Sequence, residues 1–246
     1  MLKIREASRH FGGLVAVNRV SFDVAPREIL GVIGPNGAGK TTFFNLVSGA
    51  IPLSSGQITF EGKCTGALRP HQVAHLGIGR TFQIVRPFGE LSVLENVLAG
   101  LGARFCNSLW RSLRLCRGRA HLAEARELLA RTHLLKYENE PARNLPLGLL
   151  RRLEIARALA LQPKLILLDE SFSGLSHSEC LSLVELVKTL REDGMTVLLI
   201  EHNMQITMNL CDRLVVLDRG EKIAEGLPHD IRSNERVIAA YLGSDD

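Results

Sequence analysis

A glycine-rich segment near the amino end constrains the fold of this 246-residue chain more than any other feature. Residues 34–41 read Gly-Pro-Asn-Gly-Ala-Gly-Lys-Thr and fit the pattern G-x-x-x-x-G-K-[ST]. The apolar run 29–33 comes directly before the segment and is typical of a strand that is buried on both faces. A helix is predicted over 39–48. Strand, loop and helix in this order are the context that the pattern requires, and they predict an α/β fold.

The residue types in this segment are those that bind phosphate. Glycine lets the backbone curve closely enough for successive N–H groups to face phosphate oxygens, and the following helix adds the positive end of its dipole. Lys40 then reaches the β- and γ-phosphates of a nucleotide, and the Thr41 hydroxyl ligates Mg²⁺. The predicted binding residues are Gly34, Pro35, Asn36, Gly37, Ala38, Gly39, Lys40, Thr41 and Thr42. The alternative is a glycine-rich turn that only caps the helix.

A second motif is an apolar strand that ends in two acidic residues. Residues 165–170 read Leu-Ile-Leu-Leu-Asp-Glu. A carboxylate at the end of a strand beside a phosphate loop is placed to hold Mg²⁺, which is the role predicted for Asp169. Glu170, one residue further, is placed to polarise an attacking water molecule. Many strands end in acidic residues, so the motif gains its meaning from the phosphate loop.

Composition excludes several classes of protein. Hydrophobic residues make up 46% of the chain and charged residues 23%, which excludes a disordered, collagen-like or coiled-coil chain. The net charge of +4 is too small to indicate nucleic-acid binding. No apolar run approaches the ~18–20 residues of a membrane span, and the amino end carries no secretory signal pattern. The 5 cysteines form no C-x-x-C pair, which favours free thiols in a reducing compartment.

Strand-like and helix-like runs alternate in two parts of the chain. Strands are predicted at 2–7, 20–24, 29–33, 57–60, 164–169, 195–201 and 213–218, with helices at 177–191 and 204–211. Strands that alternate with helices indicate a parallel sheet with right-handed crossovers. The intervening part shows helical periodicity at 92–103, 119–135 and 149–161. We therefore predict an α/β core of 1–84 and 162–246, interrupted by a helical subdomain of 85–161.

The two motifs frame others, and their order resembles that of the ATP-binding subunits of ABC transporters over nearly the whole chain. Thr81-Phe82-Gln83 resembles the Q-loop, which implies that Gln83 contacts Mg²⁺ and senses a transmembrane subunit. Ile200-Glu201-His202 resembles the switch-histidine motif, which implies that His202 contacts the γ-phosphate. Phe11 follows the first strand, where an aromatic residue of the family stacks on adenine. Taken singly, these residues are a surface glutamine, a structural histidine and a core aromatic.

Residues 144–159 resemble the ABC signature and its helix, the most diagnostic segment, with two departures from the L-S-G-G-Q pattern. Pro146 stands where a serine hydroxyl of the family meets the γ-phosphate, and Leu150 stands near the expected glutamine. Gly148 and the helix N-terminus remain as an anion site. A lost neutral hydrogen bond is worth roughly 0.5–1.5 kcal/mol. The departures therefore predict that ATP is held less tightly between the signature and a phosphate loop, not that this contact is lost. The alternative is a plain amphipathic helix with an arginine face.

Finer features are similar to the LivG-type subunits of branched-chain amino-acid importers. They are the segments 77–83, 151–157, 200–204 and the ending 237–243. Relatives of that group also serve other hydrophilic solutes, including urea and amides. The segment after Glu170 resembles the family's D-loop at Gly174 and Leu175 but departs from it at Ser171 and Ser176. Those departures put communication between two sites in doubt.

The resemblance implies a fold, a mechanism and partners. The fold is a single P-loop ABC nucleotide-binding domain over 1–246, with a mostly parallel core sheet, an N-terminal antiparallel β subdomain and an inserted α-helical subdomain. The signature at Gly148 would complete the ATP site of an opposing subunit, either an identical chain or a LivF-type partner. Integral-membrane permease subunits would dock around Gln83, and a periplasmic or extracellular solute-binding protein would serve the same system. The chain would lie peripherally on the cytoplasmic face of the inner membrane.

An arginine-rich stretch has two interpretations. Arg104, Arg111, Arg114, Arg117 and Arg119, with Trp110, form a basic patch. The favoured interpretation is a solvated helix face, and the other is contact with anionic lipid headgroups.

Two further functions compete with the importer ATPase. One is a soluble ABC ATPase that acts on nucleic acid or ribosomes, although no nucleic-acid partner is expected for a single cassette without a long heptad insert. The other is a degenerate regulatory nucleotide binder, which Pro146, Leu150 and Ser176 favour. The intact set of Lys40, Asp169, Glu170 and His202 argues against degeneracy.

Overall fold

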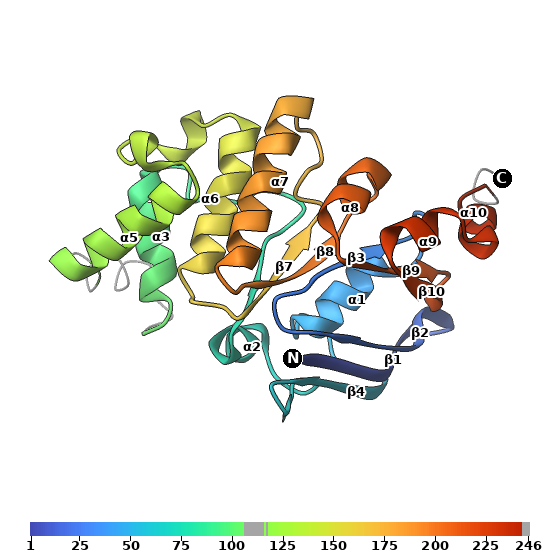
Figure 1. Ribbon diagram of the computed structural model, residues 1–246. Coiled ribbons are helices and arrows are strands. Elements are labelled where there is room, and N and C mark those ends of the chain that lie inside the picture. Colours follow the sequence, from blue (N-terminus) through green and yellow to red (C-terminus); the bar gives the residue numbers. More distant parts are fainter. Residues whose placement is uncertain (106–115, 117, 243–246) are drawn as a thin grey trace.

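Two sheets form the framework of the chain, whose computed structural model describes residues 1–105, 116 and 118–242. The four-stranded sheet is antiparallel and has the order β2-β1-β4-β5. Its strands are β1 (Leu2–Phe11), β2 (Leu14–Val24), β4 (Ser55–Phe60) and β5 (Lys63–Cys64). In Figure 1 this sheet lies below the helix α1 (Lys40–Val47). The predicted N-terminal antiparallel β subdomain is therefore present.

The six-stranded sheet carries the ends of the motifs. Its order is β10-β9-β3-β8-β7-β6, and every pairing is parallel except that of β10 with β9. The strands are β3 (Ile29–Ile33), β6 (Ile78–Arg80), β7 (Leu165–Asp169), β8 (Thr196–Ile200), β9 (Arg213–Asp218) and β10 (Glu221–Gly226). Parallel strands meet at one edge with their carboxyl ends, where ligands of open α/β sheets bind. This topology brings the segments that follow β3, β6, β7 and β8 to the same edge.

Helices cover the six-stranded sheet and extend to one side of it. They are α2 (Pro70–Leu76), α3 (Val93–Gly102), α5 (Arg119–Arg131), α6 (Leu147–Leu159), α7 (His177–Glu192), α8 (Met204–Leu210), α9 (Pro228–Arg232) and α10 (Glu235–Leu242), with short 3₁₀ turns at Leu135–Tyr137 and Ala142–Asn144. Figure 1 shows α3, α5 and α6 on one side of the sheet and α9 and α10 on the other. The division at 84/85 and 161/162 stays a prediction. No described helix has the length and apolar character that crossing a membrane requires.

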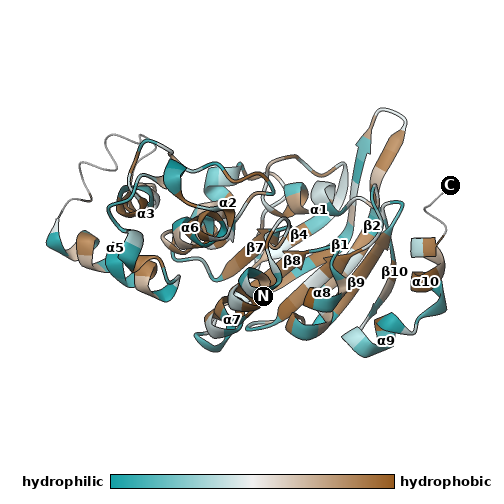
Figure 2. Cartoon of the chain, turned by 90° about the horizontal axis from the view of Figure 1, so that it is seen from above, coloured by the Kyte–Doolittle hydropathy of each residue, from teal (hydrophilic) through white to brown (hydrophobic). Residues whose placement is uncertain are grey.

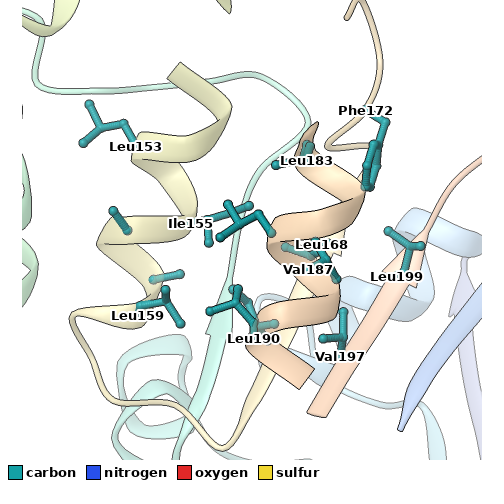
Figure 3. Packing of buried hydrophobic residues seen from close by; sticks show 14 of the residues in the cluster. Leu153, Ile155, Leu159, Leu168, Phe172, Leu183, Val187, Leu190, Val197 and Leu199 are labelled. Carbon is teal, nitrogen blue, oxygen red and sulfur yellow. The ribbon is translucent and has the colours of Figure 1, made fainter. Parts of the chain in front are cut away.

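Strand β3 separates two hydrophobic clusters. Ile29 and Ile33 belong to the cluster beneath α6 and α7, whereas Leu30 and Val32 belong to the cluster that faces the antiparallel sheet. Side chains alternate between the faces of a strand, so a continuous apolar run is needed to fill both clusters. Figure 3 shows Ile155 of α6 directed toward Val187 of α7 in the first cluster. Figure 2 shows the strands of this sheet mostly in brown, while α5 carries both polar and apolar residues.

The structure corrects the limits of two predicted strands. Strand β1 extends to Phe11, beyond the run predicted at 2–7, and strand β2 begins at Leu14, before the run predicted at 20–24. The two strands are longer because they form one hairpin that is partly exposed.

The Arg104 side chain is engaged by other residues of the protein, because it donates hydrogen bonds to Glu124 and to the Ala160 carbonyl. The predicted basic residues Arg111, Arg114 and Arg117, together with Trp110, lie outside the described residues. The four described cysteines are free, as predicted.

Candidate functional site

The glycine-rich loop joins β3 to α1 and lies against neighbouring backbone. Gly34 has φ +149° and Gly39 has φ +95°. A Cβ atom at Gly34 would overlap the Leu217 carbonyl oxygen, and one at Gly39 would overlap the Ala16 carbonyl oxygen. Both positions therefore require glycine for two reasons: a left-handed backbone and a close approach to another strand. The loop is held between β9 and β2 by this packing.

Lys40 is the first residue of α1 and its side chain turns back over the loop. Its Nζ donates to Gly34 O at 2.7 Å and to Pro35 O at 2.9 Å. An ammonium group has three N–H donors, so these two bonds leave one for a ligand. Burial lowers the pKa of Lys40, and the charge of Glu170 opposes that shift. Lys40 is therefore a buried cation aimed at the cradle of the loop.

Asp169 ends β7 and is buried, with its two oxygens in different surroundings. Oδ2 accepts a hydrogen bond from Arg80 at 2.8 Å, while Oδ1 is buried with no hydrogen-bond partner among the described residues. Burial raises the pKa of Asp169, and the Arg80 guanidinium opposes this. A buried carboxylate oxygen without a partner fits a cation. Asp169 and Thr41 line the same cavity of about 850 Å³.

The donor set suits magnesium more than a metal that is held by protein ligands alone. In the described part of the chain, no cluster of three or more His, Cys, Asp or Glu side chains is arranged to hold a metal ion. Mg²⁺ is usually bound through one or two carboxylates together with substrate phosphates and water. Thr41, Gln83 and Asp169, the predicted ligands, all line the one cavity and supply oxygen atoms. The residues present therefore fit Mg²⁺ carried by a nucleotide.

Gln83 and Glu170 are in direct contact. Gln83 Nε2 donates to Glu170 Oε2 at 2.7 Å, although the two residues follow different strands, β6 and β7. Glu170 adopts φ +47°, a left-handed conformation that costs about 1–3 kcal/mol for a non-glycine residue. Such strain concentrates at functional sites. The structure thus brings together the glutamine and the glutamate that the sequence places 87 residues apart.

The switch-histidine segment follows β8 and contains a buried carboxyl. His202 is exposed directly after the strand, and Asn203 caps α8 with its side chain. Glu201 is 1% exposed and accepts a hydrogen bond from Phe172 N at 3.0 Å. Burial raises the pKa of Glu201 to about 7. Glu201 therefore connects the loop after β7 to the loop that holds His202.

Phe11 and the signature segment lie apart from these contacts. Phe11 is 45% exposed and the Arg9 guanidinium lies 4.6 Å from its ring centre, so it is not a core aromatic. Pro146 is the N-cap residue of α6. Gly148 is buried in the first turn of α6, where a Cβ atom would overlap the Glu179 carboxylate. These two segments are not among the residues that the hydrogen bonds above connect.

Sequence reasoning gave no role to three polar residues in this region. In the sequence, Arg80, Thr81 and Glu201 appear only as parts of motifs. Thr81 Oγ1 accepts from Asp169 N at 3.3 Å and lies 3.1 Å from Ser171 Oγ. Their signal in the sequence is position: each is a polar residue at the carboxyl end of a strand that the parallel sheet buries.

The fold and the site define a nucleotide-binding cassette of the P-loop class. The family model described as ABC transporter matches residues 17–173. A second model, described as branched-chain amino acid ATP-binding cassette transporter, matches residues 221–246. The chain belongs to the ABC transporter family. The predicted fold, a P-loop ABC nucleotide-binding domain, is confirmed.

The full length of the chain is similar to known proteins. It is 42% identical over 250 residues to the high-affinity branched-chain amino acid transport ATP-binding protein LivG of Salmonella typhimurium, covering 99% of this chain and 98% of that protein. A nucleotide-free ATP-binding cassette from an ABC transporter superimposes with a TM-score of 0.89 at 31% identity, covering 98% of each chain. A dimeric cassette bound to ADP and Pi superimposes with a TM-score of 0.79 at 25% identity, covering 93% of this chain and 99% of that one.

Stability should depend on pH through Glu201. The unfolded chain releases this proton near pH 4.5 and the folded chain near pH 7, so ionisation lowers the free energy of unfolding progressively as pH rises through that window. Glu201→Gln removes the effect. The free energy of unfolding of the variant, relative to that of the parent, is therefore expected to rise between acidic pH and pH values above 7. The rise is up to about 3 kcal/mol, at about 1.4 kcal/mol per pKa unit. Urea unfolding at pH 5 and pH 8 measures this, with exposed Glu185→Gln as control. A difference between Glu201→Gln and parent that does not change with pH contradicts it.

Proposed function

We propose that this chain hydrolyses ATP to drive the import of branched-chain amino acids, or a related hydrophilic solute, through a membrane transporter. The observation that carries the hydrolytic part is the meeting of the glycine-rich loop, Asp169 and the Gln83–Glu170 pair at one edge of the sheet. The cargo rests on the branched-chain model that matches 221–246 and on the similarity to LivG. The alternative of a nucleic-acid or ribosome ATPase finds no support in these matches.

Each residue has a role in this proposal. The loop of residues 34–42 and Lys40 bind the phosphates. Thr41, Asp169 and Gln83 hold Mg²⁺, which when bound offsets phosphate charge. Glu170 accepts the proton of the attacking water, and the 2.7 Å bond from Gln83 fixes the carboxylate orientation. His202 braces the γ-phosphate, and the exposed Phe11 ring stacks on adenine. Catalysis then consists of positioning and charge stabilisation.

The chain would act as one of two cassettes. Gly148 and Pro146, at the start of α6, lie outside the hydrogen-bonded set around Lys40 and Glu170, which supports a role in the site of an opposing subunit. That subunit is an identical chain or a LivF-type partner. ATP contacts both surfaces and closes the pair, and hydrolysis removes those contacts. The two-cassette form agrees with the dimeric cassette described above.

Membrane subunits would dock on the apolar wall of the cavity beside Gln83. Phe82 and Ile84 are 56% and 66% exposed there, and Phe88 lines the same cavity. A concentration of exposed apolar side chains marks a surface for a partner. We propose integral-membrane permease subunits as that partner, with a periplasmic or extracellular solute-binding protein in the same system. The chain would then lie on the cytoplasmic face of the inner membrane.

The proposed cargo is tested by transport. The chain is reconstituted in proteoliposomes with candidate permease subunits and a candidate solute-binding protein of the same system. ATP-dependent uptake of radiolabelled leucine is expected, with little uptake of urea. Hydrolysis that drives urea uptake but not leucine uptake would overturn the branched-chain assignment. A tight affinity of the isolated chain for RNA or DNA that falls steeply with salt would favour the soluble alternative.

A charge on the docking wall, the cavity surface that includes Phe82, Ile84 and Phe88, should uncouple ATP hydrolysis from transport. Ile84→Asp places a carboxylate at a position that is 66% exposed, so the substitution should cost little folding stability. At the docked surface the same carboxylate must lose its water, which costs several kcal/mol for an unpaired charge. We expect leucine uptake to fall at least about tenfold, since 1.4 kcal/mol is a factor of ten, while ATP binding by the isolated chain stays unchanged. Leu227→Asp, exposed outside the cavity, is the matched control. Parental uptake by Ile84→Asp would refute this surface.

A further inference from the structure

Arg80, the last residue of β6, connects three parts of the site. Its Nη2 donates to Asp169 Oδ2 at 2.8 Å, and its Nη1 donates to Asn45 Oδ1 at 2.8 Å and to Ser48 Oγ at 2.7 Å. Asn45 lies on α1 and Ser48 ends it. One guanidinium thus links the helix that follows the phosphate loop to the acidic end of β7.

The position of the Arg80 guanidinium is fixed from several sides. Its side chain is 10% exposed and that of Asp169 is 3% exposed. The Phe82 ring centre lies 5.3 Å from the guanidinium carbon, within the range of a cation–π contact. Arginine keeps its charge in proteins and its planar donors hold a fixed geometry. Arg80 is therefore a rigid, permanently charged partner for a buried carboxylate.

This partner makes the two carboxylate oxygens of Asp169 different. Arg80 occupies Oδ2 of Asp169, whereas Oδ1 is buried with no hydrogen-bond partner among the described residues. Both side chains line the cavity that Thr41 also lines. Carboxylates that ligate metals are usually held by such a hydrogen bond, and loss of the bond typically costs about 10–100-fold in metal affinity or activity.

We propose that Arg80 is a positioning residue that orients Asp169 so that its Oδ1 is presented to the magnesium ion of the nucleotide. The inference rests on the proposed function, because it assumes that Asp169 is a Mg²⁺ ligand. Asn45 and Ser48 contribute by holding the guanidinium, so that the carboxylate of Asp169 keeps a fixed position relative to α1. The exposed Phe82 ring in turn covers the guanidinium beside the docking wall.

The decisive measurement is cation affinity at fixed nucleotide. Mn²⁺ replaces Mg²⁺ as a paramagnetic probe, and its dissociation constant is measured by electron paramagnetic resonance with a saturating non-hydrolysable ATP analogue. Arg80→Met removes the guanidinium and keeps an apolar side chain of similar length. We expect its Mn²⁺ dissociation constant to rise about 10–100-fold, and the Mg²⁺ concentration for half-maximal hydrolysis to rise in parallel. Nucleotide affinity in EDTA should stay within about twofold of the parent, which separates orientation of the metal ligand from damage to the loop.

Further variants make the test independent of the stability of Arg80→Met. Arg80→Lys keeps the charge but cannot span Asp169 and Asn45 together, so an intermediate increase in the Mn²⁺ dissociation constant is expected. Asn45→Ala leaves the Arg80–Asp169 pair in place and should give a smaller increase. Arg213→Met is the matched control, since Arg213 pairs with Glu28 at 2.8 Å with side chains 25% and 11% exposed. Its Mn²⁺ affinity should be parental.

The outcomes separate this inference from the proposed function. If the parent chain shows no nucleotide-dependent Mn²⁺ binding, the proposed function fails. If the parent binds Mn²⁺ and the folded Arg80 variants bind it within twofold of the parent, the role of Arg80 is wrong and the proposed function stands. A rise that Arg213→Met shares would assign the effect to stability and also overturn the role.

Discussion

Replacement of Glu170 by glutamine is expected to lower the rate of ATP hydrolysis by about 100- to 10,000-fold, the range contributed by a positioned general base. Glutamine keeps the size of the side chain but cannot accept the proton of water. Binding of ATP should be retained, because the phosphate loop and Asp169 are untouched. Released phosphate measured under saturating Mg-ATP, together with equilibrium binding of a fluorescent ATP analogue, gives both quantities.

The control for this variant is Glu185→Gln, an exposed carboxylate on α7. Its hydrolysis rate should equal that of the parent. If Glu170→Gln hydrolyses ATP at the parental rate, Glu170 is not the base and its strained backbone at φ +47° needs another explanation. If the parent is itself inactive although it binds ATP, the regulatory alternative gains support from Pro146 and Leu150.

Replacement of Lys40 by alanine should weaken ATP binding by roughly tenfold to a hundredfold. Hydrogen bonds to a charged group are worth about 1.5–3 kcal/mol, and each 1.4 kcal/mol is about a factor of ten. The variant also loses the bonds to Gly34 O and Pro35 O that hold the loop carbonyls. Isothermal titration with Mg-ATP measures the affinity. Lys188→Ala, at a half-exposed position of α7, should bind as the parent does, and unchanged binding by Lys40→Ala would count against the phosphate-loop interpretation.

The regular part of the core was predictable because its sequence signals are local. The runs 29–33 and 213–218 became β3 and β9 with the predicted limits, since strands buried on both faces must be continuously apolar. Strand β10 was not predicted, because Glu221–Gly226 is mostly polar and forms through antiparallel pairing with β9 at the sheet edge. Strand β6 has only three residues, too few for periodicity to show.

Both departures from the D-loop pattern have a local structural role. Ser176 stands where the family has aspartate or asparagine, and it caps α7 in a capping box with Glu179. Serine, aspartate and asparagine are all good N-cap residues, so the substitution keeps the start of the helix. Ser171, in place of proline, is buried and lies 3.1 Å from the Thr81 hydroxyl. Such pairings depend on which strands are neighbours, which the sequence does not state.

The site is predictable as a set of motifs but not as a network. The order of Gln83, Glu170 and His202 along the chain indicates their shared edge, whereas the bond from Gln83 to Glu170 follows from the β6–β7 pairing. The role of Arg80 is not visible in the sequence for the same reason, because arginine side chains are usually solvated, whereas this one is hydrogen-bonded to residues from two distant segments, α1 with its C-cap and the end of β7.

A crystal structure of the Glu170→Gln variant grown with ATP and Mg²⁺ tests the central claim most directly, since the variant should bind nucleotide without consuming it. The triphosphate is expected within the backbone amides of residues 34–42, with the cation beside Thr41 and Asp169 and the base against Phe11. A structure at saturating ATP in which the nucleotide occupies another place, or in which Lys40 and the loop carbonyls keep their mutual bonds and exclude it, would contradict the claim.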